Sequence, residues 1–324
     1  MRPVVRAPLL AIVGPTATGK TPLAVAVAER LDQPAELLNA DSRQVIRGLH
    51  VATCAPTPDE LHGIVCHLLA LHEPGEPFSV ADWVAAARRT VADLDTRDTM
   101  PIVVGGTGLY VSALVDGLDL ARAPAESARR AERGAIAAKP GGLARLAAEL
   151  TERDPDAATS IDLRNPRRVI RALEILDAHG PPLHRARGRG EAMPATLIGL
   201  DAPRDLHDAL IARRSRAMFE TGVLLDEVHS ALGRGVSRDA LYTAGIGYRE
   251  AFAVIDGQVT PDQAADLVAQ RTRRYAKAQR TWFRKDPRIR WLERDAGPVE
   301  RLVDEVLDAF REDARAGQRL PGRG

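Results

Sequence analysis

Short apolar runs and amphipathic segments alternate along the first third of the chain. The apolar runs are residues 7–13, 37–40 and 101–104. Uninterrupted runs of this length are typical of strands that are buried on both faces of a parallel sheet. The segments between them, 21–31 and 79–95, have helical spacing, and Ser79 and Asp82 form a capping box at the start of the second one. This alternation predicts an α/β fold, a parallel sheet covered by helices.

The pattern changes after about residue 118 and returns near residue 195. Residues 121–190 are rich in Ala, Arg and Glu and contain no convincing strand. A strand-like segment follows at 195–200, and later helices lead to a last candidate strand at 289–292. We therefore predict one α/β core made from residues 1–120 and 191–324, with a helical insertion domain at 121–190.

The composition is that of an ordinary globular protein. Of the 324 residues, 45% are hydrophobic and 27% are charged, which excludes a disordered chain and a coiled coil. The net charge of +1 means that a polyanion site must come from local clusters of basic residues. Two cysteines cannot form a disulfide framework, and no apolar run is long enough to span a membrane. We expect a cytoplasmic protein with no membrane partner.

The first apolar run leads into a loop with the full phosphate-loop pattern. The sequence GPTATGKT matches G-x-x-x-x-G-K-[ST] with the residues Gly14, Pro15, Thr16, Ala17, Thr18, Gly19, Lys20 and Thr21. The glycines allow backbone N–H groups to surround phosphate oxygens, Lys20 adds a charge, and Thr21 adds a hydroxyl for Mg²⁺. The core is thus a phosphate-loop-type sheet. The loop alone does not distinguish a nucleotide from a prenyl diphosphate, because both present the same oxygens.

Polar and small residues follow the other two predicted strands. Asp41 comes after the second strand, and VGGTGLY (104–110), with Thr107 as its polar residue, contains the end of the third. Ligands of open parallel sheets bind at the carboxyl ends of the strands. Asp41 is therefore a candidate general base or metal ligand, although an aspartate would also cap a following helix well. The glycines around Thr107 allow close approach to the backbone, or they form a tight turn.

Two clusters of basic residues lie in the predicted insertion. Asn165 and Pro166 begin a predicted helix whose first turns hold Arg167, Arg168 and Arg171, although cations there oppose the helix dipole. The run RARGRG (185–190) closes the same segment. An anionic partner would explain the first cluster. The alternative is a solvated surface on which Glu174 pairs with these arginines.

A third basic cluster lies on a long helix predicted over 260–285. Its basic residues are Arg273, Lys277, Arg280 and Arg284, which share one face and have few acids nearby in the sequence. A buried stripe is predicted at Val268, Tyr275 and Trp282, seven residues apart. A nucleic-acid backbone is a natural partner for the basic face, and a solvated face is the alternative.

Seven motifs in order resemble the tRNA dimethylallyltransferase (tRNA isopentenyltransferase) family over about residues 9–291. They are GPTATGKT (14–21), DSRQV (41–45), PFSVADW (77–83), VGGTGLY (104–110), NPRRVIRALEI (165–175), GIGYRE (245–250) and RRYAKAQRTWFRKD (273–286). Several motifs in this order are far more specific than a phosphate loop alone. Departures from the family pattern occur at Ile46, His50, Ala52, Ala55, Leu210 and Ala278, none of which is a proposed catalytic position.

The resemblance implies a reaction and its partners. Members of the family transfer a dimethylallyl group from dimethylallyl diphosphate to N6 of the tRNA adenine that is 3′-adjacent to the anticodon, and they release diphosphate. For this chain the resemblance implies a prenyltransferase that uses Mg²⁺ and binds the tRNA anticodon stem-loop. We also expect a monomer.

The resemblance also implies roles for individual residues. The phosphate loop would hold the donor diphosphate, Asp41 would take a proton from the amine, Thr107 would lie near the adenine, and Arg214 would hold the diphosphate. The implied tRNA contacts are Asp41, Ser42, Arg43, Gln44, Thr107, Arg129, Arg167, Arg168, Val169, Ile170 and Arg171, to which the long helix adds Arg273, Lys277, Arg280 and Arg284. The helical insertion resembles the domain with which the family grips the anticodon stem.

Two other classes of protein remain open from the sequence. A phosphate-loop kinase or nucleotide hydrolase would carry an aspartate for Mg²⁺ at the end of a buried strand, whereas the run at 101–104 ends in two glycines. A non-enzymatic RNA-binding protein would not need intact Lys20, Asp41 and Thr107.

Overall fold

The computed structural model describes residues 9–118, 127–182 and 192–319. The chain forms two compact units, one of Met1–Val115 with Met193–Gly324 and one of Asp116–Ala192. The predicted basic run at 185–190 lies outside the described residues. In the described ranges, no helix combines the length and the apolar character that crossing a membrane requires.

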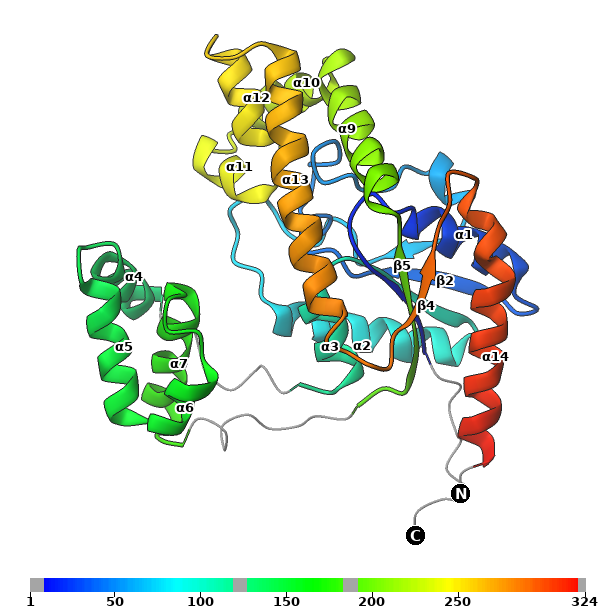
Figure 1. Cartoon of the computed structure of the whole chain (residues 1–324), viewed down its shortest axis with the longest axis horizontal. Coiled ribbons are helices and arrows are strands. Elements are labelled where there is room, and N and C mark those ends of the chain that lie inside the picture. Colours follow the sequence, from blue (N-terminus) through cyan, green and yellow to red (C-terminus); the bar gives the residue numbers. More distant parts are fainter. Residues whose placement is uncertain (1–8, 119–126, 183–191, 320–324) are drawn as a thin grey trace. The chain divides into compact units, whose positions relative to one another are not determined.

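The first unit is built on a sheet of six parallel strands in the order β3-β2-β4-β1-β5-β6 (Figure 1). The strands are β1 (Leu9–Val13), β2 (Ala35–Asn39), β3 (Cys66–His67), β4 (Met100–Gly105), β5 (Ala195–Asp201) and β6 (Arg290–Glu293). Every residue of β1 is buried, because the sheet is covered on both faces. The α/β prediction is confirmed, and each predicted strand is present. The two-residue edge strand β3 was not predicted.

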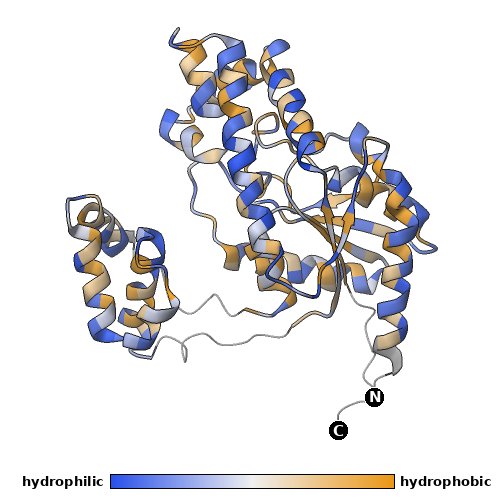
Figure 2. Ribbon diagram, in the orientation of Figure 1, coloured by the Kyte–Doolittle hydropathy of each residue, from blue (hydrophilic) through white to orange (hydrophobic). Residues whose placement is uncertain are grey.

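Helices cover both faces of this sheet. On one face, α1 (Lys20–Arg30) and α14 (Val303–Arg319) pack against Leu10 and Ile12 of β1. On the other face, α2 (Val80–Thr96) and α3 (Gly108–Val115) pack with Ala11 and Val13. Alternate residues of β1 thus enter different cores, as the geometry of a strand requires. Figure 2 shows hydrophobic residues along the strands and mixed hydropathy around the helices.

The rest of the first unit follows β5. Its helices are α9 (Arg204–Glu220), α10 (Val223–Gly233), α11 (Arg238–Ala244), α12 (Tyr248–Ile255) and α13 (Pro261–Phe283), and the short 3₁₀ segments of the unit are η1 (Asp59–Leu61) and η2 (Val299–Leu302). The capping boxes of α2 and α13 are both present, at Ser79 with Asp82 and at Thr260 with Gln263. Helix α13 packs along α9, which brings both helices to the carboxyl ends of the strands (Figure 1).

The buried stripe of α13 differs from the predicted one. Its buried residues are Ala264, Ala265, Val268, Ala269, Thr272, Ala276, Gln279 and Phe283. Val268 is in the core as predicted, but Trp282 is 40% exposed, so its assignment to the stripe was wrong. The stripe advances by steps of three or four residues, which places Phe283 rather than Trp282 on the buried face.

The second unit is a small helical bundle. It contains α4 (Ser127–Ala137), α5 (Gly142–Arg153), α6 (Pro155–Ser160) and α7 (Pro166–His179), and its described residues hold no strand. Leu146 and Leu150 of α5 pack with Leu173 and Leu176 of α7 in a core of its own. Helix α7 begins as predicted, because the Asn165 side chain accepts a hydrogen bond from the Arg168 N–H.

Candidate active site

Two cavities in the first unit lie at the carboxyl ends of β1, β2 and β4. The larger has a volume of about 600 Å³ and the smaller about 250 Å³. Five residues line both cavities: Thr16, Asp41, Thr53, Cys54 and Arg214. The fold therefore brings the phosphate loop, the predicted base and the predicted diphosphate-binding arginine to one place, as the topology of a parallel sheet favours.

The phosphate loop connects β1 to α1 and lines the larger cavity. Thr18 Oγ1 donates a hydrogen bond to the Pro15 carbonyl at 3.0 Å, and Lys20 Nζ donates to the same oxygen at 2.6 Å. Gly19, the residue before α1, has a φ of 92°, a conformation that glycine adopts without strain. The loop is thus closed on itself before α1 begins, and Lys20 and Thr21 start the helix facing the cavity.

Lys20 carries the positive charge of the loop. Its pKa is lowered to about 8, mainly because the ammonium is partly removed from water, while the negative Asp41 raises this pKa and the positive Arg214 lowers it. At neutral pH the side chain is mostly charged. A bound anion would stabilise that charge.

Asp41 lies two residues after the end of β2 and lines both cavities. Its Oδ1 accepts a hydrogen bond from the Arg43 N–H at 2.8 Å, and its own N–H donates to Asn39 Oδ1 at 3.1 Å. The chain continues in turns through residue 48 without a helix, so a capping role for Asp41 is wrong. The carboxylate instead shapes a local turn.

Asn39 was not singled out in the sequence, yet it holds this strand end. The residue is buried, and its Nδ2 donates to the Leu68 carbonyl at 3.1 Å. Its own carbonyl accepts from Trp83 Nε1 at 3.0 Å. A polar residue in the apolar run just before Asp41 was the available signal, because a buried amide needs partners.

The loop after β4 lies beside the loop after β2. Thr107 Oγ1 accepts a hydrogen bond from the Ser42 N–H at 2.9 Å, and the Thr107 N–H donates to the Ala40 carbonyl at 3.0 Å. Thr107 is thus hydrogen-bonded to Ser42, the residue that follows Asp41 in the sequence. Gln44, further along the same turn, donates from Nε2 to the Cys54 carbonyl at 2.7 Å and lines the larger cavity.

The glycines of this loop make room for α13. A Cβ atom on Gly106 would lie 2.2 Å from Gln279 Nε2, and one on Gly108 would lie 2.1 Å from the Trp282 ring. The close approach that the sequence allowed is therefore made by side chains of the protein itself. Trp282 covers Gly108, which explains its partial burial outside the stripe.

Arg214 reaches the phosphate loop from α9. Its Nη2 donates to Thr16 Oγ1 at 3.0 Å. Two further side chains that the sequence did not reveal also hold Thr16. Gln279 Oε1 accepts from the Thr16 N–H at 2.8 Å, and His207 Nε2 lies 2.8 Å from the Thr16 carbonyl.

The basic face of α13 is more strongly paired than the sequence indicated. Arg280 forms two hydrogen bonds with Asp201 at 2.8 and 2.7 Å, and Arg284 lies 3.3 Å from the same carboxylate. Arg273 pairs with Asp208 at 3.3 Å. Few acids lie nearby in the sequence, as stated above, but Asp201 of β5 and Asp208 of α9 supply partners from far away in the sequence.

The pKa of Asp201 shows the effect of these arginines on its carboxyl group. Burial raises its pKa, but hydrogen bonds from Arg280, from the Ala202 N–H and from Arg284 outweigh this effect, and the pKa lies below its usual value. The guanidinium of Arg280 is therefore bound to the buried carboxylate of Asp201. Lys277 and Arg273 project from exposed positions of the same helix.

The GIGYRE motif supports the cavity walls. The Tyr248 hydroxyl is buried and donates to Glu227 Oε1 at 2.9 Å, and Glu227 Oε2 accepts from the Val51 N–H at 2.8 Å. Glu250 pairs with Arg271 of α13 at 2.9 Å. The motif thus ties the 50–54 segment and α12 to α13. Glu227, on α10, was not predicted.

In the second unit, the predicted tRNA-contacting residues of α7 divide into two groups. Arg167, Arg168 and Arg171 line a cavity of about 510 Å³ that also contains Ile161 and Ile175. Val169 and Ile170 are buried in the core of the bundle. Their side chains pack in the core of the bundle, and their contact with RNA stays a prediction.

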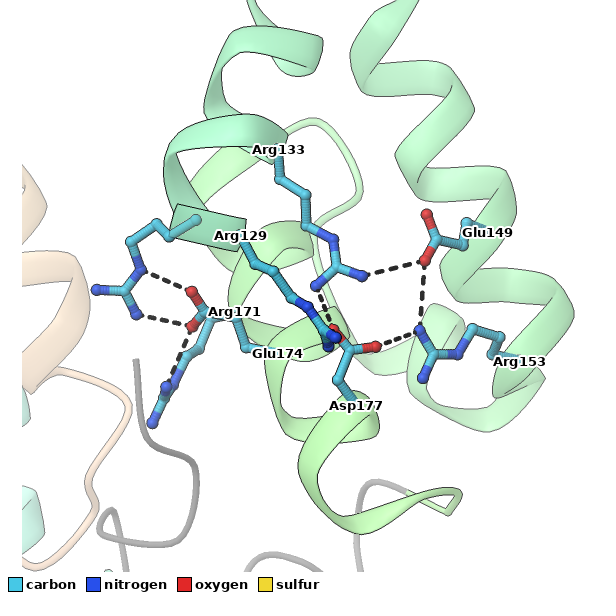
Figure 3. A network of polar contacts seen from close by, with 8 residues as sticks. Arg129, Arg133, Glu149, Arg153, Arg171, Glu174 and Asp177 are labelled. Carbon is cyan, nitrogen blue, oxygen red and sulfur yellow. Dashed lines mark hydrogen bonds and ion pairs between the residues drawn. The ribbon is translucent and has the colours of Figure 1, made fainter. Parts of the chain in front are cut away.

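A network of ion pairs joins the helices of the second unit (Figure 3). Asp177 contacts Arg133 and Arg153 at 2.7 Å each, and Arg129 at 3.5 Å. Glu174 pairs with Arg130 at 2.7 Å and with Arg171 at 3.1 Å, as the surface-pairing alternative predicted for Arg171. Burial raises the pKa of both carboxyl groups, but hydrogen bonds from these arginines outweigh it and lower the pKa.

Comparison with known proteins assigns this chain to a family. A family model described as IPP transferase matches residues 44–286, and one described as isopentenyl transferase matches residues 7–70. The tRNA dimethylallyltransferase of Geobacillus thermodenitrificans is 38% identical over 306 residues, which cover 94% of this chain and 95% of that protein. That of Thermobifida fusca is 39% identical over 308 residues, 92% of this chain and 93% of that protein.

Solved structures agree with this assignment. The tRNA isopentenylpyrophosphate transferase of Bacillus halodurans is 36% identical, with a TM-score of 0.68, over 97% of this chain and 100% of that one. A eukaryotic dimethylallyltransferase acting on tRNA, at 21% identity and a TM-score of 0.77 over 97% of this chain and 81% of that one, shares the fold. Because one family model spans most of the chain and relatives more than 30% identical match it almost end to end, the chain belongs to the IPP transferase family.

Proposed function

We propose that this chain is a tRNA dimethylallyltransferase. It transfers the dimethylallyl group of dimethylallyl diphosphate to N6 of the adenine 3′-adjacent to the anticodon and releases diphosphate. The observation that carries this proposal is that Asp41, Arg214 and Thr16 of the phosphate loop line both cavities. A proton acceptor and the phosphate loop therefore face one reaction space.

The donor diphosphate would bind at the phosphate loop in the larger cavity. Lys20 and Arg214 supply two positive charges there, and the N-terminus of α1 supplies backbone N–H groups. Negative charge grows on the diphosphate as its bond to the prenyl carbon breaks. Donors that are already in place stabilise this charge and lower the barrier.

The residues of the larger cavity fit a bound Mg²⁺. Thr21, Asp41 and Glu60 all line it, and their side chains carry oxygen atoms, the ligand type that Mg²⁺ takes. Thr21 would hold the ion beside the diphosphate. The ion would supply further positive charge against the departing oxygens.

Asp41 would act on the acceptor. An aromatic amine is a weak nucleophile, so removal of its proton during attack assists the reaction. As the new bond between N6 and the prenyl carbon forms, the carbon–oxygen bond breaks. The N6 proton passes to the Asp41 carboxylate, and the electron pair leaves with the diphosphate. The adenine must leave the stacked loop to reach this position.

Labelled substrates test the proposal. The purified chain is incubated with labelled dimethylallyl diphosphate or labelled ATP, each with and without tRNA. We expect label in tRNA only from the prenyl donor. Hydrolysis of ATP without transfer would instead identify a nucleotide hydrolase or kinase. Binding of tRNA with neither reaction would identify an RNA-binding protein.

We expect the double variant Arg273→Ala, Lys277→Ala to weaken tRNA binding. Each lost phosphate contact makes the slope of log K against log salt shallower by about one unit, so the double variant should change it by about two. Arg280 is excluded from this test because it is bound to the buried carboxylate of Asp201, whereas the pair of Arg273 with Asp208 is exposed to solvent. Filter binding over a range of salt concentrations gives the slope.

The matched control is the double variant Arg301→Ala, Arg311→Ala. It removes two exposed arginines from η2 and α14, which lie on the other face of the sheet. Its slope should equal that of the parent. Equal slopes for both double variants would mean that the α13 face is only solvated.

A further inference from the structure

Gln279 occupies an unusual place for an amide side chain. It lies on the buried face of α13 and is 5% exposed. Its Oε1 accepts from the Thr16 N–H at 2.8 Å, and its Nε2 donates to the Gly106 carbonyl at 2.9 Å. These partners fix the orientation of the amide, because an N–H needs an acceptor and a carbonyl needs a donor.

Thr16 belongs to the phosphate loop, and its N–H, carbonyl and hydroxyl groups each have a hydrogen-bond partner. Gln279 holds its N–H, His207 Nε2 faces its carbonyl, and Arg214 holds its hydroxyl. Since the carbonyl can only accept, His207 carries its proton on Nε2. All of these partners come from α9 and α13 and none from the phosphate loop itself.

A second layer keeps His207 in this state. Its Nδ1 accepts from Arg280 Nη2 at 3.0 Å, and Arg280 is held by Asp201. Burial lowers the pKa of His207, the hydrogen bond to Thr16 raises it, and the charge of Arg280 lowers it further, with a net decrease. The imidazole is therefore neutral and bridges α13 to the phosphate loop.

The other end of Gln279 reaches the loop after β4, which lies beside the turn that holds Asp41. Gly106 precedes Thr107, whose hydroxyl accepts from the Ser42 N–H next to Asp41. Tyr275, one turn earlier on α13, is hydrogen-bonded to both Thr107 and Gln279. Burial raises the pKa of the Tyr275 hydroxyl to about 12, although these two hydrogen bonds lower it. One amide thus spans the phosphate loop and the loop beside Asp41.

We propose that Gln279 is a positioning residue that fixes the phosphate loop relative to the Gly106–Thr107 loop. Its contribution to rate rests on the proposed function above, whereas its contribution to diphosphate binding does not. A displacement of about 1 Å between reacting groups can cost about 10²-fold in rate. A single amide that bridges both loops limits this displacement.

Three variants test the proposal. Gln279→Met keeps an unbranched side chain of similar length and loses both hydrogen bonds. Gln279→Glu keeps an acceptor for the Thr16 N–H, but its carboxylate has no hydrogen for the Gly106 carbonyl. Gln270→Met is the matched control, because Gln270 is exposed on the same helix. Binding of inorganic diphosphate with Mg²⁺ is measured by calorimetry, and prenyl transfer is measured at saturating substrates.

We expect Gln279→Met to bind diphosphate several-fold more weakly than the control and to lower kcat by about 10- to 100-fold. Gln279→Glu should also lower kcat at least about tenfold. Rates are referred to the folded fraction, measured by circular dichroism, so that a residue needed only for packing would change the melting temperature and leave kcat unchanged. If Gln279→Met does not fold, Gln279→Glu, which is nearly isosteric, carries the test.

The outcomes separate the two proposals. Folded Gln279 variants with the kcat and diphosphate affinity of Gln270→Met would overturn the positioning role. A parent chain without prenyl transfer would overturn the proposed function alone, since the calorimetric comparison of Gln279→Met with Gln270→Met still decides whether Gln279 orders the phosphate loop.

Discussion

Lys20→Ala is expected to weaken the binding of dimethylallyl diphosphate by about 10- to 100-fold and to leave tRNA binding near that of the parent. A hydrogen bond from a charged group contributes about 1.5–3 kcal/mol, and this one would be made in a partly desolvated cavity. The variant also removes the bond from Lys20 to the Pro15 carbonyl, but Thr18 still donates to that oxygen. The loop should therefore keep its course.

The pH dependence gives this prediction a second readout. Because the pKa of Lys20 is about 8, the free protein loses the Lys20 charge as the pH rises above 8. A bound diphosphate favours the charged form, so binding then requires uptake of a proton, and affinity should fall with rising pH above 8. Lys20→Ala should not show this decline.

Lys139→Ala is the control for charge removal, since Lys139 is exposed in the second unit. Calorimetry with the prenyl donor compares the three proteins from pH 7 to 9. Parent-like affinity in Lys20→Ala would mean that the phosphate loop is not the donor site.

Local sequence patterns were sufficient for the sheet and the phosphate loop. Strands buried on both faces must be apolar throughout, so β1 and β4 could be recognised from their composition alone. The edge strand Cys66–His67 has only two residues and carries no such pattern. The capping box of α2 depends on two residues three apart in the sequence, which is why it was predicted correctly.

The phase of α13 illustrates a limit of pattern analysis. A seven-residue spacing linked Val268 to Trp282, but the buried face follows Thr272, Ala276, Gln279 and Phe283. The observed buried stripe contains a glutamine and a threonine, so a search for apolar residues alone does not identify it. A buried polar residue in such a stripe signals a specific partner, and Gln279 has two.

Partners that are distant in the sequence could not be predicted. Thr16 meets His207 and Gln279, which lie 191 and 263 residues further along the chain. The acids that pair with the basic face come likewise from other elements. Only the fold brings these groups together, and its long-range contacts decide which basic residues remain available for an RNA backbone.

Asp41→Asn is expected to slow prenyl transfer by about 10²–10⁴-fold while both substrates still bind. Asparagine keeps the Oδ1 acceptor for the Arg43 N–H, so the turn after β2 should survive. What it loses is the capacity to accept a proton near neutral pH. The loss should therefore fall on the chemical step rather than on binding.

One indirect effect of Asp41→Asn must be separated from catalysis. The charge of Asp41 raises the pKa of Lys20, so its removal lowers that pKa and weakens the donor site at high pH. Single-turnover transfer is therefore measured at pH 7 or below, with saturating donor and tRNA. Asp308→Asn, an exposed site on α14, serves as the control for the substitution itself. If Asp41 only shapes its turn, asparagine serves equally well and the rate stays near that of the parent. Such a result would remove Asp41 from the mechanism, and positioning and stabilisation of the diphosphate would then account for catalysis.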